Sequence, residues 1–325
     1  MVSDSRGSPA SLDQARPDSD ELLADVLRGL SEPPYALSPK YLYDQRGSEL
    51  FDRICDLEAY YPTRTELSIL EESGGEIASA VGGEALVVEL GSGSSNKTRA
   101  LLDRLPQPAA YVPVDISREH LEAAAARIDG IYPELEVLPV AADYTRPFPL
   151  PRPTCPAERT LLYFPGSTLG NFDLPDAEDF LARQAEQAGS GGGMVLGLDL
   201  QKDVDVLLRA YDDPEGITAA FNRNLLQRLR KELGADLDIE AFAHRARFNE
   251  ELGCVEMHLE SLTDQEVRIG GHAIPFQTGQ TIRTERSYKY TLDGFRTLAE
   301  RAGFRVAQVW TDPAAYFSVQ YLEVV

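Results

Sequence analysis

The sequence predicts an α/β fold in which helices cover a mostly parallel β-sheet, joined to a second, α+β region. The first observation is a buried strand at residues 86–90 that runs into Gly91-Ser92-Gly93 and then into a helix pattern. The second is a regular alternation of helical segments with apolar runs at 110–115, 135–141, 159–164 and 193–200. The third is a change of pattern after residue 202, where charged helical segments and then alternating strands replace it.

Composition limits the classes of partner. The chain has 325 residues, and its 31 Lys and Arg against 53 Asp and Glu give a net charge of −22. Nucleic-acid backbones and anionic membranes would be repelled by such a protein. The sequence has no apolar run of membrane-spanning length and no signal-peptide core at its start. We therefore expect a cytoplasmic monomer that binds neither nucleic acid nor membrane.

Cysteine and histidine spacing gives no indication of a metal site or a disulfide framework. The three cysteines are odd in number and widely separated, and the four histidines show no paired spacing; they are Cys55, Cys155, Cys254, His120, His244, His258 and His272. We predict buried thiols in a reducing compartment and no metal.

The N-terminal part combines a polar tail with a cluster of tyrosines. Residues 1–18 are rich in Ser, Asp, Pro and Gly and are predicted to be disordered. A helix is predicted over 21–30, a proline-containing connector over 31–39 and another helix over 65–80. Between the connector and the second helix lie Tyr41, Tyr43, Tyr60 and Tyr61. These rings suit the wall of a pocket for a small polar molecule, or alternatively pack in the core with their hydroxyls at the surface.

The strand, Gly-x-Gly turn and helix start around residue 91 form a nucleotide-binding turn, because glycines and free helix N–H groups let a ligand approach the backbone. Glu89 precedes the turn, and the third glycine of a dinucleotide fingerprint is missing, since Asn96 stands in its place. This combination disfavours NAD and favours a cationic nucleoside without phosphates, such as S-adenosylmethionine (SAM). The alternative is an ordinary βα turn without a ligand.

Polar residues follow the next strands at the edge where ligands bind in open α/β sheets. Asp115 lies 24 residues after Gly91, near the spacing at which a carboxylate holds ribose hydroxyls. Asp143 and Tyr144 follow the third strand, where they can hydrogen-bond an adenine amine and stack on its ring. Asn171 follows the fourth strand and supplies an amide to the substrate side.

The later part of the chain carries a second candidate site. Residues 203–236 are predicted to be helical, and 245–290 strand-like, with Met257 on an apolar strand face. In the last of these strands Arg283, Glu285, Ser287 and Lys289 share one face. A carboxylate and a hydroxyl about 7 Å apart can hold the two nitrogens of an imidazole; the alternative is a solvated polar face. The chain closes with a helix at 292–302 and strands at 304–310 and 315–324.

Five stretches carry a resemblance to a known family: residues 43–52, 60–66, 89–98, 166–171 and 210–224. They resemble the histidine-specific, SAM-dependent Nα-methyltransferases of ergothioneine biosynthesis, and the resemblance covers about residues 20–325. It implies a class I, Rossmann-like, seven-stranded methyltransferase domain (66–201 plus 289–325) and a second α+β substrate-binding domain (19–65 plus 202–288).

The resemblance also implies roles for individual residues. The SAM contacts would be Gly91, Lys97, Asp115, Asp143 and Tyr144, with Tyr43 bordering both SAM and the reacting amine. Asn171 and Tyr211 would hold the carboxylate and α-amine of the substrate, and with Tyr43 they form the expected catalytic set. The imidazole would be surrounded by Tyr60, Met257, Glu285 and Ser287.

The implied reaction is an SN2 transfer of methyl groups from SAM to the α-amine of L-histidine, which yields the trimethylated betaine hercynine. Alignment of the reactants would supply most of the rate. With an α-amino pKa of about 8, a neighbouring tyrosine or water can accept the proton. Two alternatives remain from the residues themselves: a methyltransferase of another amino acid or small amine, and a SAM-binding module without catalysis.

Overall fold

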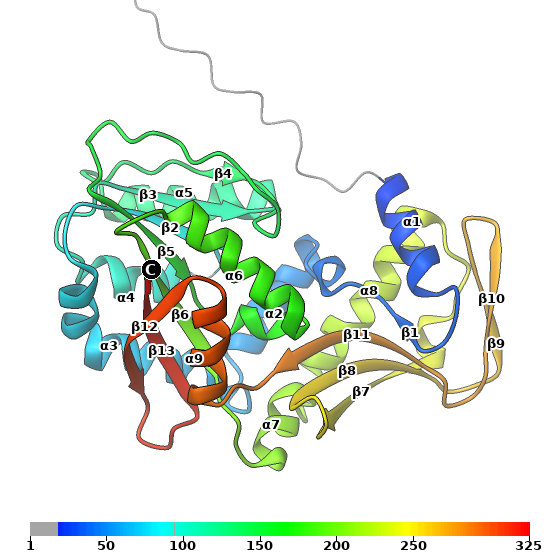
Figure 1. The fold of residues 1–325 in the computed structure, drawn as a ribbon. Helices are drawn as coiled ribbons and strands as arrows, with labels where there is room; N and C mark the ends of the chain where they lie inside the picture. Colours follow the sequence, from blue (N-terminus) through cyan, green and yellow to red (C-terminus); the bar gives the residue numbers. More distant parts are fainter. Residues whose placement is uncertain (1–18, 94) are drawn as a thin grey trace, which may run out of the picture.

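A computed structural model describes residues 19–93 and 95–325. The predicted disordered tail, 1–18, lies outside the described residues. The largest element is a seven-stranded sheet, seen at the left of Figure 1. Its spatial order is β12 (Phe304–Thr311), β13 (Phe317–Val324), β6 (Gly193–Asp199), β5 (Arg159–Phe164), β2 (Ala85–Leu90), β3 (Ala110–Asp115) and β4 (Val140–Ala141).

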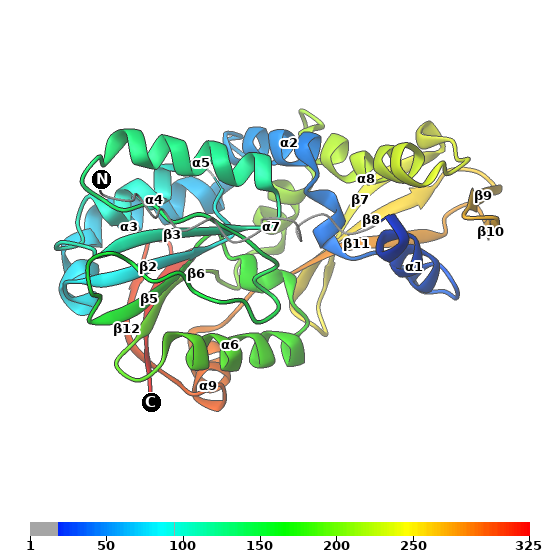
Figure 2. The same ribbon diagram turned by 90° about the horizontal axis from the view of Figure 1, so that it is seen from above.

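The sheet confirms the predicted fold class. Strands β4, β3, β2, β5 and β6 pair in parallel, and β13 runs antiparallel between β6 and β12. Helices cover both faces, as Figure 2 shows from above. One face carries α3 (Tyr61–Val81), α4 (Ser95–Leu102) and α5 (Arg118–Ile131), and the other carries α6 (Leu174–Ala188) and α9 (Leu292–Arg301). Strand alternation explains this, because Val87 packs with the first helix layer and Leu86 and Val88 pack with the second.

The second region, at the right of Figure 1, has a hydrophobic core of its own. A four-stranded sheet has the order β1 (Tyr35–Ala36), β11 (Thr281–Tyr288), β8 (Cys254–Ser261) and β7 (Phe242–Asn249), and a hairpin joins β9 (Gln265–Ile269) to β10 (His272–Phe276). Its helices are α1 (Ser19–Gly29), α2 (Gln45–Cys55), α7 (Val204–Tyr211) and α8 (Ile217–Leu233), with short 3-10 turns η1 (Pro39–Leu42) and η3 (Ile239–Ala241). This region therefore combines the N-terminal helices with the segment inserted before the end of the large sheet.

Three expectations about local structure are wrong. The strand predicted over 135–141 is reduced to β4, because Pro139 has no N–H to give to the ladder. The helix predicted over 203–236 is two helices, interrupted at Pro214 and at Gly216, whose φ is 73°. Arg283 does not lie on the same strand face as Glu285, because a β-bulge lies between these two residues.

No helix in the two described segments, 19–93 and 95–325, is long and apolar enough to cross a membrane. Within the same residues, no group of three or more His, Cys, Asp or Glu side chains is arranged to hold a metal ion.

Candidate active site

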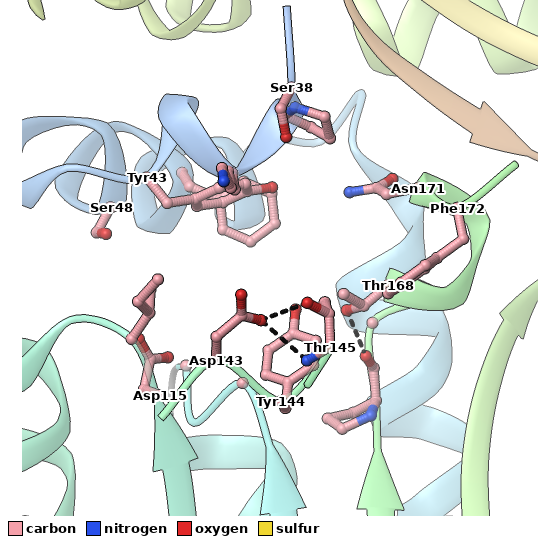
Figure 3. A pocket seen from close by; sticks show the side chains of 18 of the residues that line it. Ser38, Tyr43, Ser48, Asp115, Asp143, Tyr144, Thr145, Thr168, Asn171 and Phe172 are labelled. Carbon is pink, nitrogen blue, oxygen red and sulfur yellow. Dashed lines mark hydrogen bonds between the residues drawn. The ribbon is translucent and has the colours of Figure 1, made fainter. Parts of the chain in front are cut away.

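A cavity of about 680 Å³ lies at the carboxyl ends of β2, β3 and β5, between the large sheet and the N-terminal helices of the second region. Eight of the predicted site residues line it: Tyr43, Tyr60, Gly91, Lys97, Asp115, Asp143, Tyr144 and Asn171. Figure 3 shows Asp115, Asp143 and Tyr144 on one side of this pocket and Tyr43 on the other, with Asn171 at the right, next to Phe172. The chain thus brings residues from both regions to one space.

The floor of the cavity is an aromatic ring next to a glycine. Gly91 has a φ of 79°, and a Cβ at this position would lie 3.5 Å from Cε1 of Tyr144. The ring of Tyr144 packs against Phe164 and Phe180, with centroid distances of 5.6 and 6.3 Å. Glycine is favoured here because the backbone has a positive φ that other residues rarely adopt, whereas a Cβ would make only an ordinary van der Waals contact with the ring. The result is a flat apolar surface beside the turn.

Two carboxylates at the strand ends are held in place by the backbone that follows them. Oδ1 of Asp115 accepts a hydrogen bond from the Ser117 N–H at 2.8 Å, and Oδ1 of Asp143 accepts one from the Thr145 N–H at 2.9 Å. Burial raises the pKa of the Asp115 carboxyl. These positions suit a ribose diol and an adenine amine, and their charge would repel a diphosphate.

Glu89 lines the same cavity but is bound from within the sheet. Its carboxylate accepts hydrogen bonds from the hydroxyls of Thr98, at 2.9 Å, and of Tyr111. Burial raises the pKa of Glu89 to about 7. The acidic residue that marked the turn in the sequence therefore also fastens the start of α4 to β2 and β3.

Lys97 is positioned by an acid that the sequence did not single out. Its Nζ donates to Oε2 of Glu66 at 2.8 Å, and the Glu66 carboxylate also accepts from the Gly166 N–H at 2.9 Å. The Glu66 side chain is buried in α3. One carboxylate thus links α3, the start of α4 and the loop after β5 around the cavity.

The tyrosine cluster divides into two pairs. Tyr43 and Tyr60 line the cavity, and burial raises the pKa of both phenols well above its ordinary value, so both are neutral. Tyr41 and Tyr61 lie elsewhere, with hydroxyls that donate to Asp25 at 2.6 Å and to Asp199 at 2.7 Å. The prediction of a tyrosine wall therefore holds for two of the four residues.

The remaining four predicted residues form a buried cluster behind Tyr60, outside the cavity lining: Tyr211, Met257, Glu285 and Ser287. The hydroxyl oxygens of Tyr211 and Ser287 lie 2.7 Å apart. Met257 pairs directly with Glu285 across β8 and β11, which puts both side chains on one face. Burial raises the pKa of Glu285 to about 7, and its Oε2 has no hydrogen-bond partner within the described residues. This oxygen is free to accept a hydrogen bond from a donor outside the chain, such as a ligand or an ordered water.

Sequence reasoning missed one charged group next to this cluster. Lys289 Nζ lies 2.8 Å from each of Tyr211 Oη, Ser287 Oγ and Asp199 Oδ2. Strand alternation placed Lys289 on the face of Glu285 and Ser287, and this pattern could have identified it as a residue of the cluster. The meeting with Asp199, at the end of β6, depends on how the two sheets pack.

Together, the sheet order with its antiparallel β13, the glycine turn and the acids at the strand ends define a class I SAM-dependent methyltransferase. The cavity fits SAM, because its carboxylates and flat aromatic floor complement a cationic nucleoside. More narrowly, the chain belongs to the SAM-dependent, histidine-specific methyltransferases, whose family model matches residues 22–324.

Individual relatives are named for methylation of histidine, for ergothioneine biosynthesis and, in one case, for methylation of tryptophan. A histidine N-alpha-methyltransferase of Mycolicibacterium smegmatis is 40% identical over 307 residues, which are 93% of this chain and 94% of the relative. Ergothioneine biosynthesis protein 1 of Neurospora crassa is 30% identical over 86% of this chain and 32% of its own length. An L-tryptophan methyltransferase of Psilocybe serbica is 28% identical over 98% of this chain and 96% of its own. Proteins similar to this chain thus carry names with two different amino-acid substrates.

Proposed function

We propose that this enzyme methylates the α-amine of L-histidine three times with SAM as donor, producing hercynine, and that this is the first step of ergothioneine biosynthesis. Support comes from the family and from the relatives named for histidine methylation and ergothioneine biosynthesis. The proposed partners are small molecules only, and the proposed state is a cytoplasmic monomer.

The observation that carries the choice of substrate is the unpartnered Oε2 of Glu285 in the buried cluster. A ring with an N–H donor satisfies this acceptor, whereas a purely apolar ring leaves it buried and unpaired. Ser287, two residues along the strand, supplies a hydroxyl for the second ring nitrogen. Imidazole is the amino-acid side chain that carries two nitrogens in one small ring.

The chain's own residues bind and align the reactants. Gly91, Lys97, Asp115, Asp143 and Tyr144 are proposed to hold SAM, whose sulfonium supplies an already activated methyl group. Asn171 and Tyr211 are proposed to hold the α-carboxylate and α-amine, and Tyr60, Met257, Glu285 and Ser287 the imidazole. Fixing the nitrogen in line with the methyl group supplies most of the rate in such a transfer.

Removal of the proton from the α-amine does not require a strong base in the site. The α-ammonium must lose its proton before each methyl transfer, and a water molecule can take that proton. Tyr43 borders the proposed amine site, and its neutral phenol oxygen can accept a hydrogen bond from the amine. Because each methylation adds bulk to the nitrogen, we propose that the carboxylate and ring contacts set the affinity.

We also propose a division into a SAM-binding domain, 66–201 plus 289–325, and a substrate-binding domain, 19–65 plus 202–288. The separate hydrophobic cores of the two regions support it. The reacting amine would then lie between the domains, next to Tyr43 and Asn171.

The test is mass spectrometry of L-histidine incubated with the protein and SAM, with tryptophan, tyrosine and histamine in parallel. We expect a gain of three methyl groups on histidine and none on histamine, which lacks the carboxylate. Methylation of a different amino acid would overturn the imidazole assignment. Binding of SAM without methylation of any of the four compounds would favour a module without catalysis.

A further inference from the structure

A group of buried charges lies behind the proposed histidine site. Asp199 accepts from Lys289 at 2.8 Å and from Lys202 at 2.5 Å, and the three side chains are 1%, 0% and 4% exposed. Lys202 also donates to the Tyr61 hydroxyl and to the Leu200 carbonyl. One carboxylate is therefore paired with two ammonium groups.

The second ammonium is not needed to neutralise Asp199. Taking a charge out of water costs several kcal/mol, and one lysine is enough to balance one carboxylate. Burial, with Lys289 contributing, lowers the pKa of Lys202 to about 8. Burial acts against the charge of Lys289 too, but Asp199 raises the pKa of Lys289 above its ordinary value. What distinguishes Lys289 from Lys202 is its contact with Tyr211 and Ser287, which points to a role for Lys289 in what it contacts besides Asp199.

The hydrogen bonds of Lys289 can be counted. An ammonium has three N–H groups, and those of Lys289 are directed at Asp199, Tyr211 and Ser287. Tyr211 and Ser287 therefore both act as acceptors toward Lys289. Their own contact, at 2.7 Å, uses one of the two hydroxyl hydrogens. One hydroxyl hydrogen remains, and it is available to the ligand.

We propose that Lys289 is a positioning residue that orients the Tyr211 and Ser287 hydroxyls so that the pair presents a single donor to the substrate. This inference rests on the proposed histidine site. With Glu285 accepting one ring N–H, the Ser287 hydroxyl donates to the other ring nitrogen, which selects the neutral imidazole. Tyr211 then donates to Ser287 and faces the substrate as an acceptor.

Two matched variants test the role of Lys289. Lys289→Met and Lys202→Met each remove one buried ammonium and leave Asp199 paired with the other, but the hydrogen bonds of Lys202 among the described residues go to Tyr61, Asp199 and Leu200 rather than to Tyr211 or Ser287. We expect Lys289→Met to raise the KM for histidine about tenfold or more, with unchanged SAM affinity and no loss of melting temperature. Lys202→Met should leave the KM for histidine within about twofold, because Lys202 makes no hydrogen bond to Tyr211 or Ser287 within the described residues.

Equal histidine KM values in the two variants, or a fall in melting temperature with unchanged KM in Lys289→Met, would overturn the proposal and leave a structural role. If the Met variants do not fold, Lys289→Gln and Lys202→Gln carry the same comparison. The double variant Lys289→Met, Ser287→Ala should raise the histidine KM no more than the more harmful of the two single changes, because both changes act on one contact. If the effects of the two changes on the histidine KM add, Lys289 does not act through Ser287.

The wild-type protein separates this inference from the proposed function. Failure of the wild type to methylate histidine overturns the proposed function and, with it, the role given to Lys289. If the wild type methylates histidine but the Lys289 and Lys202 variants have equal histidine KM values, only the role of Lys289 is overturned. In the expected case, Lys289→Met also moves the pH dependence of the histidine KM to higher pH, because Glu285 loses a neighbouring cation.

Discussion

The ring of Tyr60 lies edge-on to the ring of Tyr211, with centroids 6.2 Å apart and planes at 70°. Tyr60 lines the large cavity, and Tyr211 belongs to the buried cluster with Ser287 and Glu285. This contact joins the space that fits SAM to the group proposed to hold the imidazole. The predictions below follow from that connection.

Glu285→Ala should weaken histidine methylation and relax selection toward tryptophan. The variant removes the buried acceptor and opens space beside Met257, its partner across the strands. Loss of a hydrogen bond to a charged group costs about 1.5–3 kcal/mol, so we expect a fall of about 10- to 100-fold in kcat/KM for histidine. Competition assays with both amino acids measure this; an unchanged histidine-to-tryptophan ratio contradicts the imidazole assignment.

The affinity for histidine should rise with pH around neutrality. Burial raises the pKa of Glu285 to about 7, so its carboxylate form accumulates above that pH. Free imidazole titrates over a similar range, and Glu285→Gln is the control that isolates the carboxylate. We expect the wild-type KM to fall between about pH 6 and 8.5 more steeply than that of the variant. Parallel profiles would show that Glu285 is not the titrating group.

Glu285 should also make the folded protein less stable as the pH rises, whereas its effect on histidine affinity is to raise it. A carboxyl whose folded pKa is raised binds more protons in the folded state, so its contribution to stability is present at low pH and is lost as the pH rises through about 7. Chemical unfolding at pH 5 and pH 8 measures this contribution. Glu285→Gln should reduce the difference between the two pH values, and an unchanged difference would assign it to other groups.

Asn171→Asp should impair substrate binding more than SAM binding. Asn171 lines the cavity at the end of η2 (Thr168–Asn171), where its amide is proposed to meet the α-carboxylate. A second negative charge there would repel the substrate, and we expect the KM for histidine to rise about 100-fold or more. Calorimetry with S-adenosylhomocysteine supplies the control, since its affinity should change little. A large loss of that affinity would move Asn171 to the cofactor side.

Asp115→Ala should impair SAM binding more than histidine binding. The Asp115 carboxylate lies at the end of β3, held by the Ser117 N–H, and is proposed to accept from the ribose hydroxyls. Losing these hydrogen bonds should weaken SAM binding by about 10- to 100-fold. The histidine KM at saturating SAM should stay near the wild-type value. Unaltered SAM affinity would place the nucleoside elsewhere.

Gly197→Ala should destabilise the protein through Glu66. A Cβ at Gly197, in the middle of β6, would lie 2.1 Å from Oε1 of Glu66, the carboxylate that holds Lys97 and the Gly166 N–H. Overpacking of this kind costs about 1–3 kcal/mol, measurable by denaturant unfolding. Gly75→Ala is the control: a Cβ there meets nothing within 4 Å on the exposed side of α3, and alanine should stabilise the helix by about 0.5–1 kcal/mol.

Local patterns allowed much of the fold to be predicted. The strand ending at Leu90, the glycine turn and the alternation of helices with apolar runs correspond to β2, α4 and the parallel part of the large sheet. Hydrophobic periodicity carries this information because each element must bury one face. It failed where a single residue breaks the pattern, as Pro139 does in the third predicted strand and Pro214 and Gly216 do between α7 and α8.

The sequence by itself determined the α/β architecture, the residues at the strand ends that meet in one cavity, and the placement of Glu285 and Ser287 on one strand face. Only the tertiary structure decided that Lys289 is paired with Asp199 beneath Tyr211, and that Tyr60 connects the cavity to the buried cluster. The physical reason is distance along the chain. Periodicity fixes the direction of a side chain within its own strand or helix, whereas hydrogen bonds between distant segments depend on how two sheets and their helices pack.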